Sequence, residues 1–106
     1  MYGVVIAPKG SERGRKIIIT EPVLSGLTMD AVQAEALRAV SKHGIHVISG
    51  PEYTDCDRLA ILMEEVGEVA HELTYDQARD KDKLVKELIQ VATMAAMWAE
   101  YADSTP

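Results

Sequence analysis

The fold is decided by residues 57–73, whose sequence is DRLAILMEEVGEVAHEL. Its apolar residues recur at the three- and four-residue spacing of an amphipathic helix: Leu59, Leu62, Met63, Val66, Val69, Ala70 and Leu73. Thr54 and Asp57 have the three-residue spacing of a capping box, with Asp in place of the usual Glu. We therefore predict a long helix that begins near Thr54 or Asp55 and ends within residues 73–75.

Two more helices are predicted, one on each side of this stretch. Thr28 is a candidate cap for the earlier helix, which runs to about Lys42 and stops at Gly44. Asp80 or Asp82 can cap the later helix, whose buried side is marked by Leu84, Leu88, Val91, Ala92, Ala95, Trp98, Ala99 and Ala102. Because only a short polar connection joins the second and third helices, they are expected to pack antiparallel.

The first 26 residues have a different character. Two β-branched runs, Val4-Val5-Ile6 and Lys16-Ile17-Ile18-Ile19-Thr20, flank a loop-like segment rich in Gly and charge. They predict a short N-terminal β-hairpin. The chain is accordingly divided into an extension over residues 1–26 and a helical domain over residues 27–106, and the fold class is mainly α.

Composition excludes several classes of protein. The chain has 106 residues, 47% of them hydrophobic, with no Phe and a formal net charge of −6. This acidity argues against a binder of nucleic acid polymers, which needs clustered Lys and Arg. Cys56 is the only cysteine, so an intrachain disulfide is impossible and a reducing compartment is expected. No run resembles a signal peptide or reaches the length of a membrane span, so a cytoplasmic location without membrane contact is predicted.

The third helix predicts association between subunits. Residues 91–99 are apolar nearly all round, and a helix of this kind is buried on more than one side. A chain with so few helices cannot cover it alone. We therefore expect the antiparallel helical bundle to be completed by oligomerisation into a homodimer or homotetramer.

Acidic residues form the candidate site. Glu64, Glu65 and Glu68 cluster on one side of the second helix, where like charges at spacings of three and four destabilise a helix unless something compensates. On the third helix, Glu87 and Gln90 also share a face, and antiparallel packing can bring them opposite the first group. Oxygen ligands converging from two rigid helices suit Mg²⁺. A solvated acidic strip is the simpler alternative.

Gly67 lies among these acids. A glycine inside a helix costs about 1 kcal/mol relative to alanine. It is interpreted either as leaving room for a ligand or as allowing a tight helix crossing.

The segments Glu64-Glu65-Val66-Gly67-Glu68 and Glu87-Leu88-Ile89-Gln90 resemble the two-part signature of the MazG-like all-α nucleoside triphosphate pyrophosphohydrolases. The resemblance covers roughly residues 54–102. It implies a Mg²⁺-dependent enzyme, with Mn²⁺ as a substitute, that converts nucleoside triphosphates into monophosphates and pyrophosphate. This chain departs from the signature at Gln90, where the family most often has Asp; an amide oxygen can ligate Mg²⁺ but carries no charge.

The resemblance also implies roles for individual residues. Glu65, Glu68 and Glu87 would bind the metal, together with Gln90, and Glu64 would be a further ligand or would position or deprotonate the attacking water. Lys83 and Lys86 are candidates for binding the phosphates. Candidates for contacting the base are Trp98, Tyr53, His43 and His46, although Trp98 also fits a core or subunit interface.

Two alternative functions remain open. A non-catalytic helical interaction module would share the fold and use the acids as a solvated or docking face, and Gln90 favours it. Phosphoribosyl-ATP pyrophosphohydrolase has a similar acidic helix, but the Gln-Val-Ala-rich third helix resembles that branch less.

Overall fold

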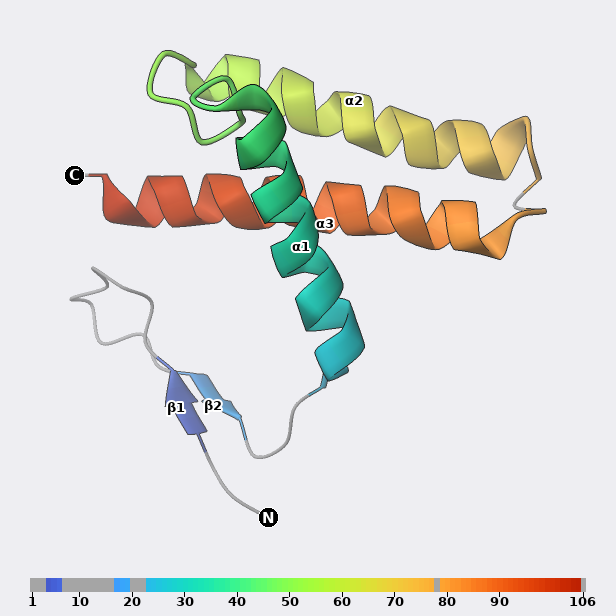
Figure 1. Cartoon of the computed structure of the whole chain (residues 1–106), viewed down its shortest axis with the longest axis horizontal. Coiled ribbons are helices and arrows are strands. Elements are labelled where there is room, and N and C mark those ends of the chain that lie inside the picture. Colours follow the sequence, from blue (N-terminus) through green and yellow to red (C-terminus); the bar gives the residue numbers. More distant parts are fainter. Residues whose placement is uncertain (1–3, 7–16, 20–22, 78, 106) are drawn as a thin grey trace.

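A computed structural model describes residues 4–6, 17–19, 23–77 and 79–105, and the fold is mainly helical. Its helices are α1 (Gly26–His43), α2 (Asp55–Thr74) and α3 (Lys81–Ser104). Helices α2 and α3 lie side by side and run antiparallel, as predicted, while α1 crosses α3 at a steep angle (Figure 1). Two three-residue strands, β1 (Val4–Ile6) and β2 (Ile17–Ile19), pair antiparallel. The loop of the predicted hairpin lies outside the described residues, so the hairpin stays a prediction.

Local capping explains where the helices begin. Thr54 caps α2, and its reciprocal hydrogen bonds with Asp57 complete the predicted capping box. The Asp80 side chain accepts a hydrogen bond from the backbone N–H of Lys83 and so caps α3. The predicted cap of α1 was wrong: Ser25 caps this helix, and its hydroxyl accepts from the backbone N–H of Thr28. Because Thr28 is the residue being capped, α1 begins three residues earlier than predicted.

Gly44 ends α1, as predicted. Its φ of 60° is a left-handed conformation that glycine adopts without strain, and its N–H donates to the carbonyl of Val40. The chain then continues through residues 44–54, which we name the α1–α2 loop, before α2 begins.

The crossing of α1 and α3 centres on a buried threonine. Thr93 of α3 is completely buried, and its hydroxyl lies 2.7 Å from the carbonyl of Ile89 and 3.5 Å from that of Val32 in α1. Among the described residues, the buried hydrophobic side chains are Ala39 of α1 and Val47 and Ile48 of the α1–α2 loop. Within the same part of the chain, no helix combines the length and apolar character that crossing a membrane requires.

Gly67 has open space around it. A Cβ atom built at this position meets nothing within 4 Å. Within the described chain no helix packs closely against Gly67, so the tight-crossing interpretation finds no support, whereas the interpretation that Gly67 leaves room for a ligand stays a prediction.

We expect Gly67→Ala to raise the free energy of unfolding by about 0.5–1 kcal/mol, because alanine has the higher helix propensity and no clash opposes it. Urea denaturation measures this change. A loss of stability would instead mean that a second subunit approaches α2 closely at Gly67.

Candidate metal centre and adjoining cavity

Three carboxylates from α2 and α3 come together. One carboxylate oxygen from each of Glu65, Glu68 and Glu87 lies within 4.8 Å of the other two. Glu65 and Glu87 are half-buried, whereas Glu68 is exposed. Antiparallel packing of two rigid helices thus brings together acids that are 19 to 22 residues apart in sequence. Such a cluster could hold a metal ion, because hard oxygen ligands are those that Mg²⁺ prefers.

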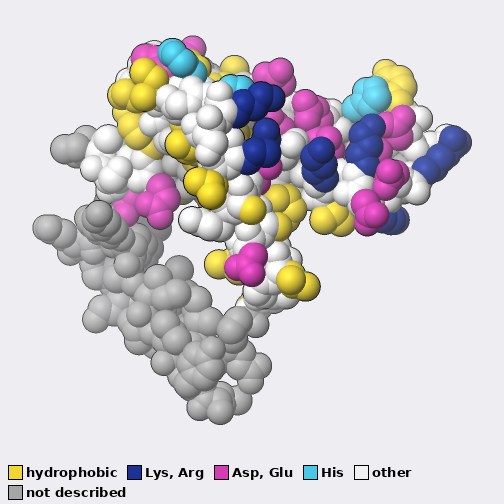
Figure 2. Space-filling view, viewed as in Figure 1, with side chains coloured by type: hydrophobic (Ala, Val, Ile, Leu, Met, Phe, Trp, Pro, Cys, Tyr) yellow, Lys and Arg dark blue, Asp and Glu magenta, His cyan; other side chains and the backbone are white. Residues whose placement is uncertain are grey.

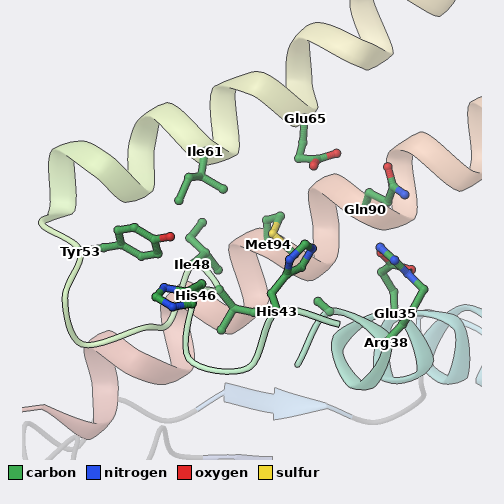
Figure 3. Close-up of a pocket in the computed structure, with 12 residues that line it drawn as sticks. Glu35, Arg38, His43, His46, Ile48, Tyr53, Ile61, Glu65, Gln90 and Met94 are labelled. Carbon is green, nitrogen blue, oxygen red and sulfur yellow. The ribbon is translucent and has the colours of Figure 1, made fainter. Parts of the chain in front are cut away.

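Gln90 joins this cluster from α3. With its amide oriented to satisfy its neighbours, its nitrogen donates to Glu65 Oε2 at 3.2 Å and to Glu87 Oε2 at 3.1 Å. Glu65 and Gln90 point toward each other across the space between the two helices (Figure 3). The amide thereby bridges two like charges and reduces their repulsion. To ligate a metal, Gln90 would have to turn its oxygen toward the ion instead.

The clustering changes the acidity of these groups. Burial, followed by the charges of Glu68 and Glu87, raises the pKa of Glu65 to about 7. The pKa of Glu87 is also raised, first by a hydrogen bond with Glu68 and then by burial. Bringing these carboxylates together without a cation is unfavourable, and the cluster responds by holding protons.

Stability without metal should therefore fall as pH rises. The folded protein binds more protons at Glu65 than the unfolded chain does between about pH 4.5 and about 7, so this stabilising contribution is lost through that range. Because Glu65 is partly exposed, solvent screening limits the effect to about 1 kcal/mol. Urea denaturation in chelator at each end of the range measures it. Glu65→Gln should flatten the profile, and an unchanged profile in that variant would contradict the assignment.

The other predicted site residues lie at varying distances from the cluster. Glu64 is exposed and lies outside the group of three. Lys83 pairs with Glu72 at 3.0 Å and Asp76 at 3.5 Å, and the Glu72 carboxylate raises its pKa. Lys86 is exposed and close enough to Glu35 to help lower the pKa of that carboxyl.

The structure does not bring Trp98 to the carboxylates. It lines a separate depression formed by α2 and α3, together with Leu62 and Ala95. Within one chain this position is compatible with an interface role and places the indole away from the candidate metal centre.

A cavity of about 240 Å³ adjoins the carboxylates and includes Glu65 and Gln90 in its lining. Its far side is formed by the α1–α2 loop and the end of α1, so that His43, His46 and Tyr53 border it (Figure 3). These are three of the four residues predicted to contact a base. The remaining lining is partly apolar and consists of Ala39, Val47, Ile48, Ile61 and Met94 with Glu35 and Arg38.

The contribution of Glu35 and Arg38 of α1 was not predicted. Glu35 and Arg38 form an ion pair on this helix, with Arg38 Nε 2.8 Å from Glu35 Oε2, and both side chains line the cavity. The hydrogen bond from Arg38 lowers the pKa of Glu35. Their spacing of three residues is visible in the sequence, but only the crossing of α1 over α3 brings them toward Glu65.

A second acidic cluster lies at the far end of α2. Ligand atoms of His71, Glu72 and Asp76 are also mutually within 4.8 Å. Here Lys83 already neutralises Glu72, which is almost fully buried. Figure 2 shows basic side chains interleaved with acidic ones toward this end of the molecule. The Lys83 ammonium therefore already pairs with two of the three groups that could bind a metal here.

No protein-family model matches this sequence, and the comparisons with curated proteins and with solved structures find no match either.

Proposed function

We propose that the chain is a Mg²⁺-dependent nucleoside triphosphate pyrophosphohydrolase that converts its substrate into a nucleoside monophosphate and pyrophosphate. The observation that carries this proposal is the convergence of Glu65, Glu68 and Glu87 beside a cavity of about 240 Å³. The carboxylates supply ligands for a divalent cation, and the cavity supplies a place for the base.

The donor set fits magnesium better than softer metals. The three convergent groups are carboxylates, with an amide beside them and no thiolate or imidazole in the group. Glu65, Glu68 and Glu87 would hold the ion, and Gln90 would complete the set by turning its oxygen inward. Bound Mg²⁺ would neutralise the charge of the triphosphate and polarise its phosphoryl oxygens.

Different residues of the chain would then assist different parts of the reaction. Glu64, exposed beside the trio, would orient a water molecule and accept its proton as the water oxygen attacks the α-phosphorus. The bond from the α-phosphorus to the bridging oxygen breaks, and pyrophosphate leaves. Lys86 and Arg38 carry positive charges near the cavity and would attract the phosphates. Positioning and electrostatics supply most of the catalysis in phosphoryl transfer.

The cavity suits a single base. Its volume is slightly below the range of about 300–1,000 Å³ typical of drug-sized ligands, so it would take one heterocycle while the phosphates remain outside. Tyr53 and the two histidines offer stacking and hydrogen bonding, and Ile48 and Ile61 offer apolar contact.

A homo-oligomer is part of this proposal. An apolar stripe on α2, whose members are four, three and seven residues apart as in a helix-packing seam, remains substantially exposed: Leu59 50%, Met63 53%, Val66 36% and Leu73 53%. On α3, Val85 and Leu88 are 56% and 47% exposed. Since few hydrophobic side chains of the described residues are fully buried, a second copy covering these faces would supply missing core.

Pyrophosphate release from a panel of ribo- and deoxyribonucleoside triphosphates, with phosphoribosyl-ATP included, tests the proposal. We expect turnover that needs Mg²⁺ or Mn²⁺ and stops with chelator. Thermal stabilisation by these metals without turnover would favour a binding protein. Neither turnover nor stabilisation would favour the non-catalytic interaction module.

A further inference from the structure

The wall of the cavity formed by the α1–α2 loop has little regular structure to support it. His46, Val47, Ile48 and Tyr53 line the cavity from this loop. Its own backbone contributes a few turn hydrogen bonds, from His46 to His43 at 3.0 Å, from Gly50 to Val47 at 2.7 Å and from Tyr53 to Gly50 at 3.3 Å. Apart from the His46–Glu52 pair within the loop, the positions of these side chains relative to Glu65 therefore depend on contacts from outside the loop.

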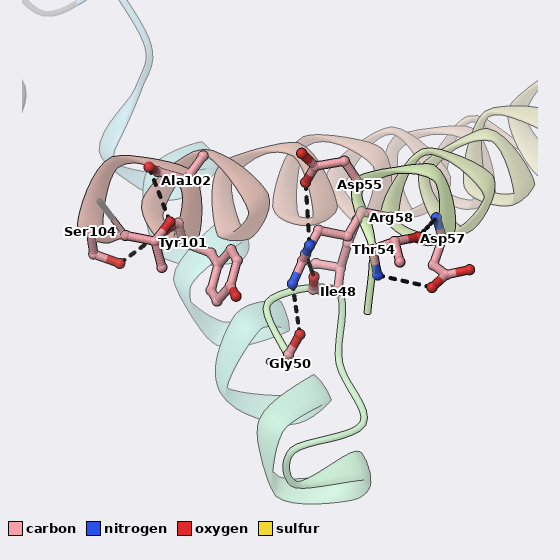
Figure 4. Close-up of polar contacts among 10 residues, drawn as sticks. Ile48, Gly50, Thr54, Asp55, Asp57, Arg58, Tyr101, Ala102 and Ser104 are labelled. Carbon is pink, nitrogen blue, oxygen red and sulfur yellow. Dashed lines mark hydrogen bonds and ion pairs between the residues drawn. The ribbon is translucent and has the colours of Figure 1, made fainter. Parts of the chain in front are cut away.

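Arg58 of α2 lies behind this wall and is only 3% exposed. Its Nε donates to the carbonyl of Ile48 and its Nη2 to that of Gly50, each at 2.8 Å (Figure 4). The guanidinium also lies over the ring of Tyr101, with its Cζ 4.1 Å from the ring centroid. One side chain thus joins the loop, the first turn of α2 and the last turns of α3.

The arrangement is specific to a guanidinium. Burying a positive charge is costly, and the nearest carboxylate, Asp55 at 3.2 Å, is itself 82% exposed and compensates only in part. Two carbonyls two residues apart can be held together by the planar fork of Arg, whereas the single ammonium of Lys is a point charge. The position is therefore suited to fixing loop geometry.

We propose that Arg58 is a positioning residue for the ligand cavity: by holding the carbonyls of Ile48 and Gly50, it fixes the loop wall that faces Glu65. It acts through the loop and does not itself line the cavity. This inference rests on the proposed function in so far as the cavity receives the base of a nucleotide. The inference that Arg58 orders the loop depends only on its contacts with Ile48, Gly50 and Tyr101.

Arg58→Lys and Tyr101→Ala test it, with Asp55→Ala and Tyr101→Phe as matched controls. Asp55→Ala removes only the exposed partner, and Tyr101→Phe keeps the ring under the guanidinium. With the best substrate of the wild type, the two test variants should raise KM about tenfold while kcat and the affinity for Mn²⁺ change less than about threefold. Both controls should keep the wild-type KM.

Hydrogen exchange separates this inference from the proposed function. In Arg58→Lys, the amides of Gly50 and Tyr53 should exchange about tenfold faster, with the protection of α2 and α3 retained. Unchanged exchange in the loop would overturn the inference whatever the activity. Loss of protection throughout the helices, or a joint loss of kcat and Mn²⁺ affinity, would overturn it in favour of a general structural role. If the wild-type protein showed no turnover, the proposed function would be contradicted, but hydrogen exchange would still test whether Arg58 orders the loop.

Discussion

Replacing Glu68 with Gln is expected to lower metal-dependent turnover by about 10³-fold while stabilising the metal-free protein. Glu68 is the exposed member of the trio, and its carboxylate approaches both Glu65 and Glu87. The substitution keeps the shape of the side chain and removes one of three clustered negative charges. A metal site loses a charged ligand, whereas the folded chain loses a source of repulsion.

Opposite changes in activity and stability are the signature of a functional cluster. Steady-state kinetics with Mg²⁺ and urea denaturation in chelator measure the two effects on the same preparation. Glu100→Gln, at an exposed position further along α3, is the matched control and should leave both quantities near their wild-type values. Full turnover in Glu68→Gln would place the catalytic site elsewhere.

The second large effect is expected at Gly50. A Cβ atom at this position would lie 2.1 Å from the carbonyl oxygen of Ile45 and 2.9 Å from that of Val47. Both neighbours are backbone atoms of the α1–α2 loop, so they cannot rotate aside as the end of a side chain would. Gly50→Ala should therefore destabilise the protein by about 2–3 kcal/mol, the upper part of the range found when packed sites are overfilled.

Thermal unfolding measures this loss as a fall in Tm of roughly 10 °C or more for a chain of this size. Gly67→Ala makes the same chemical change on the open surface of α2 and is expected to act in the opposite direction. A Gly50→Ala protein as stable as the wild type would show that the carbonyls of Ile45 and Val47 do not pack closely against Gly50.

Local signals in the sequence predicted most of the helical layout. The side chains of Thr54 and Asp80 cap the helices they precede, and Asp57 completes the capping box from the first turn of α2; each acts within three residues of its position. The start of α1 was missed because Ser25 and Thr28 are both good caps at adjacent turns. Propensity alone does not decide between them, whereas the hydroxyl of Ser25 accepting from the N–H of Thr28 does.

Parts of the candidate site depend on contacts between distant segments, and these could not be read from the sequence. Spacing along α2 and α3 anticipated that Glu65, Glu68 and Glu87 would converge. The angle at which α1 crosses α3 decides that Glu35 and Arg38 border the same cavity, and no periodicity within α1 specifies that angle. Likewise, the sequence shows Arg58 only as an ordinary charge in the first turn of a helix. Its burial beneath the α1–α2 loop depends on the path of that loop in the fold.

Direct titration of the metal-free protein with Mn²⁺ is the measurement that bears most closely on the metal centre. The ligands come from two helices, so Glu87→Gln on α3 should weaken Mn²⁺ binding about tenfold or more even though Glu65 and Glu68 on α2 are intact. Asp76→Asn, in the cluster that Lys83 already neutralises, should leave the affinity unchanged. Mn²⁺ affinity that is insensitive to Glu87→Gln, or lost in Asp76→Asn, would contradict a centre formed between α2 and α3.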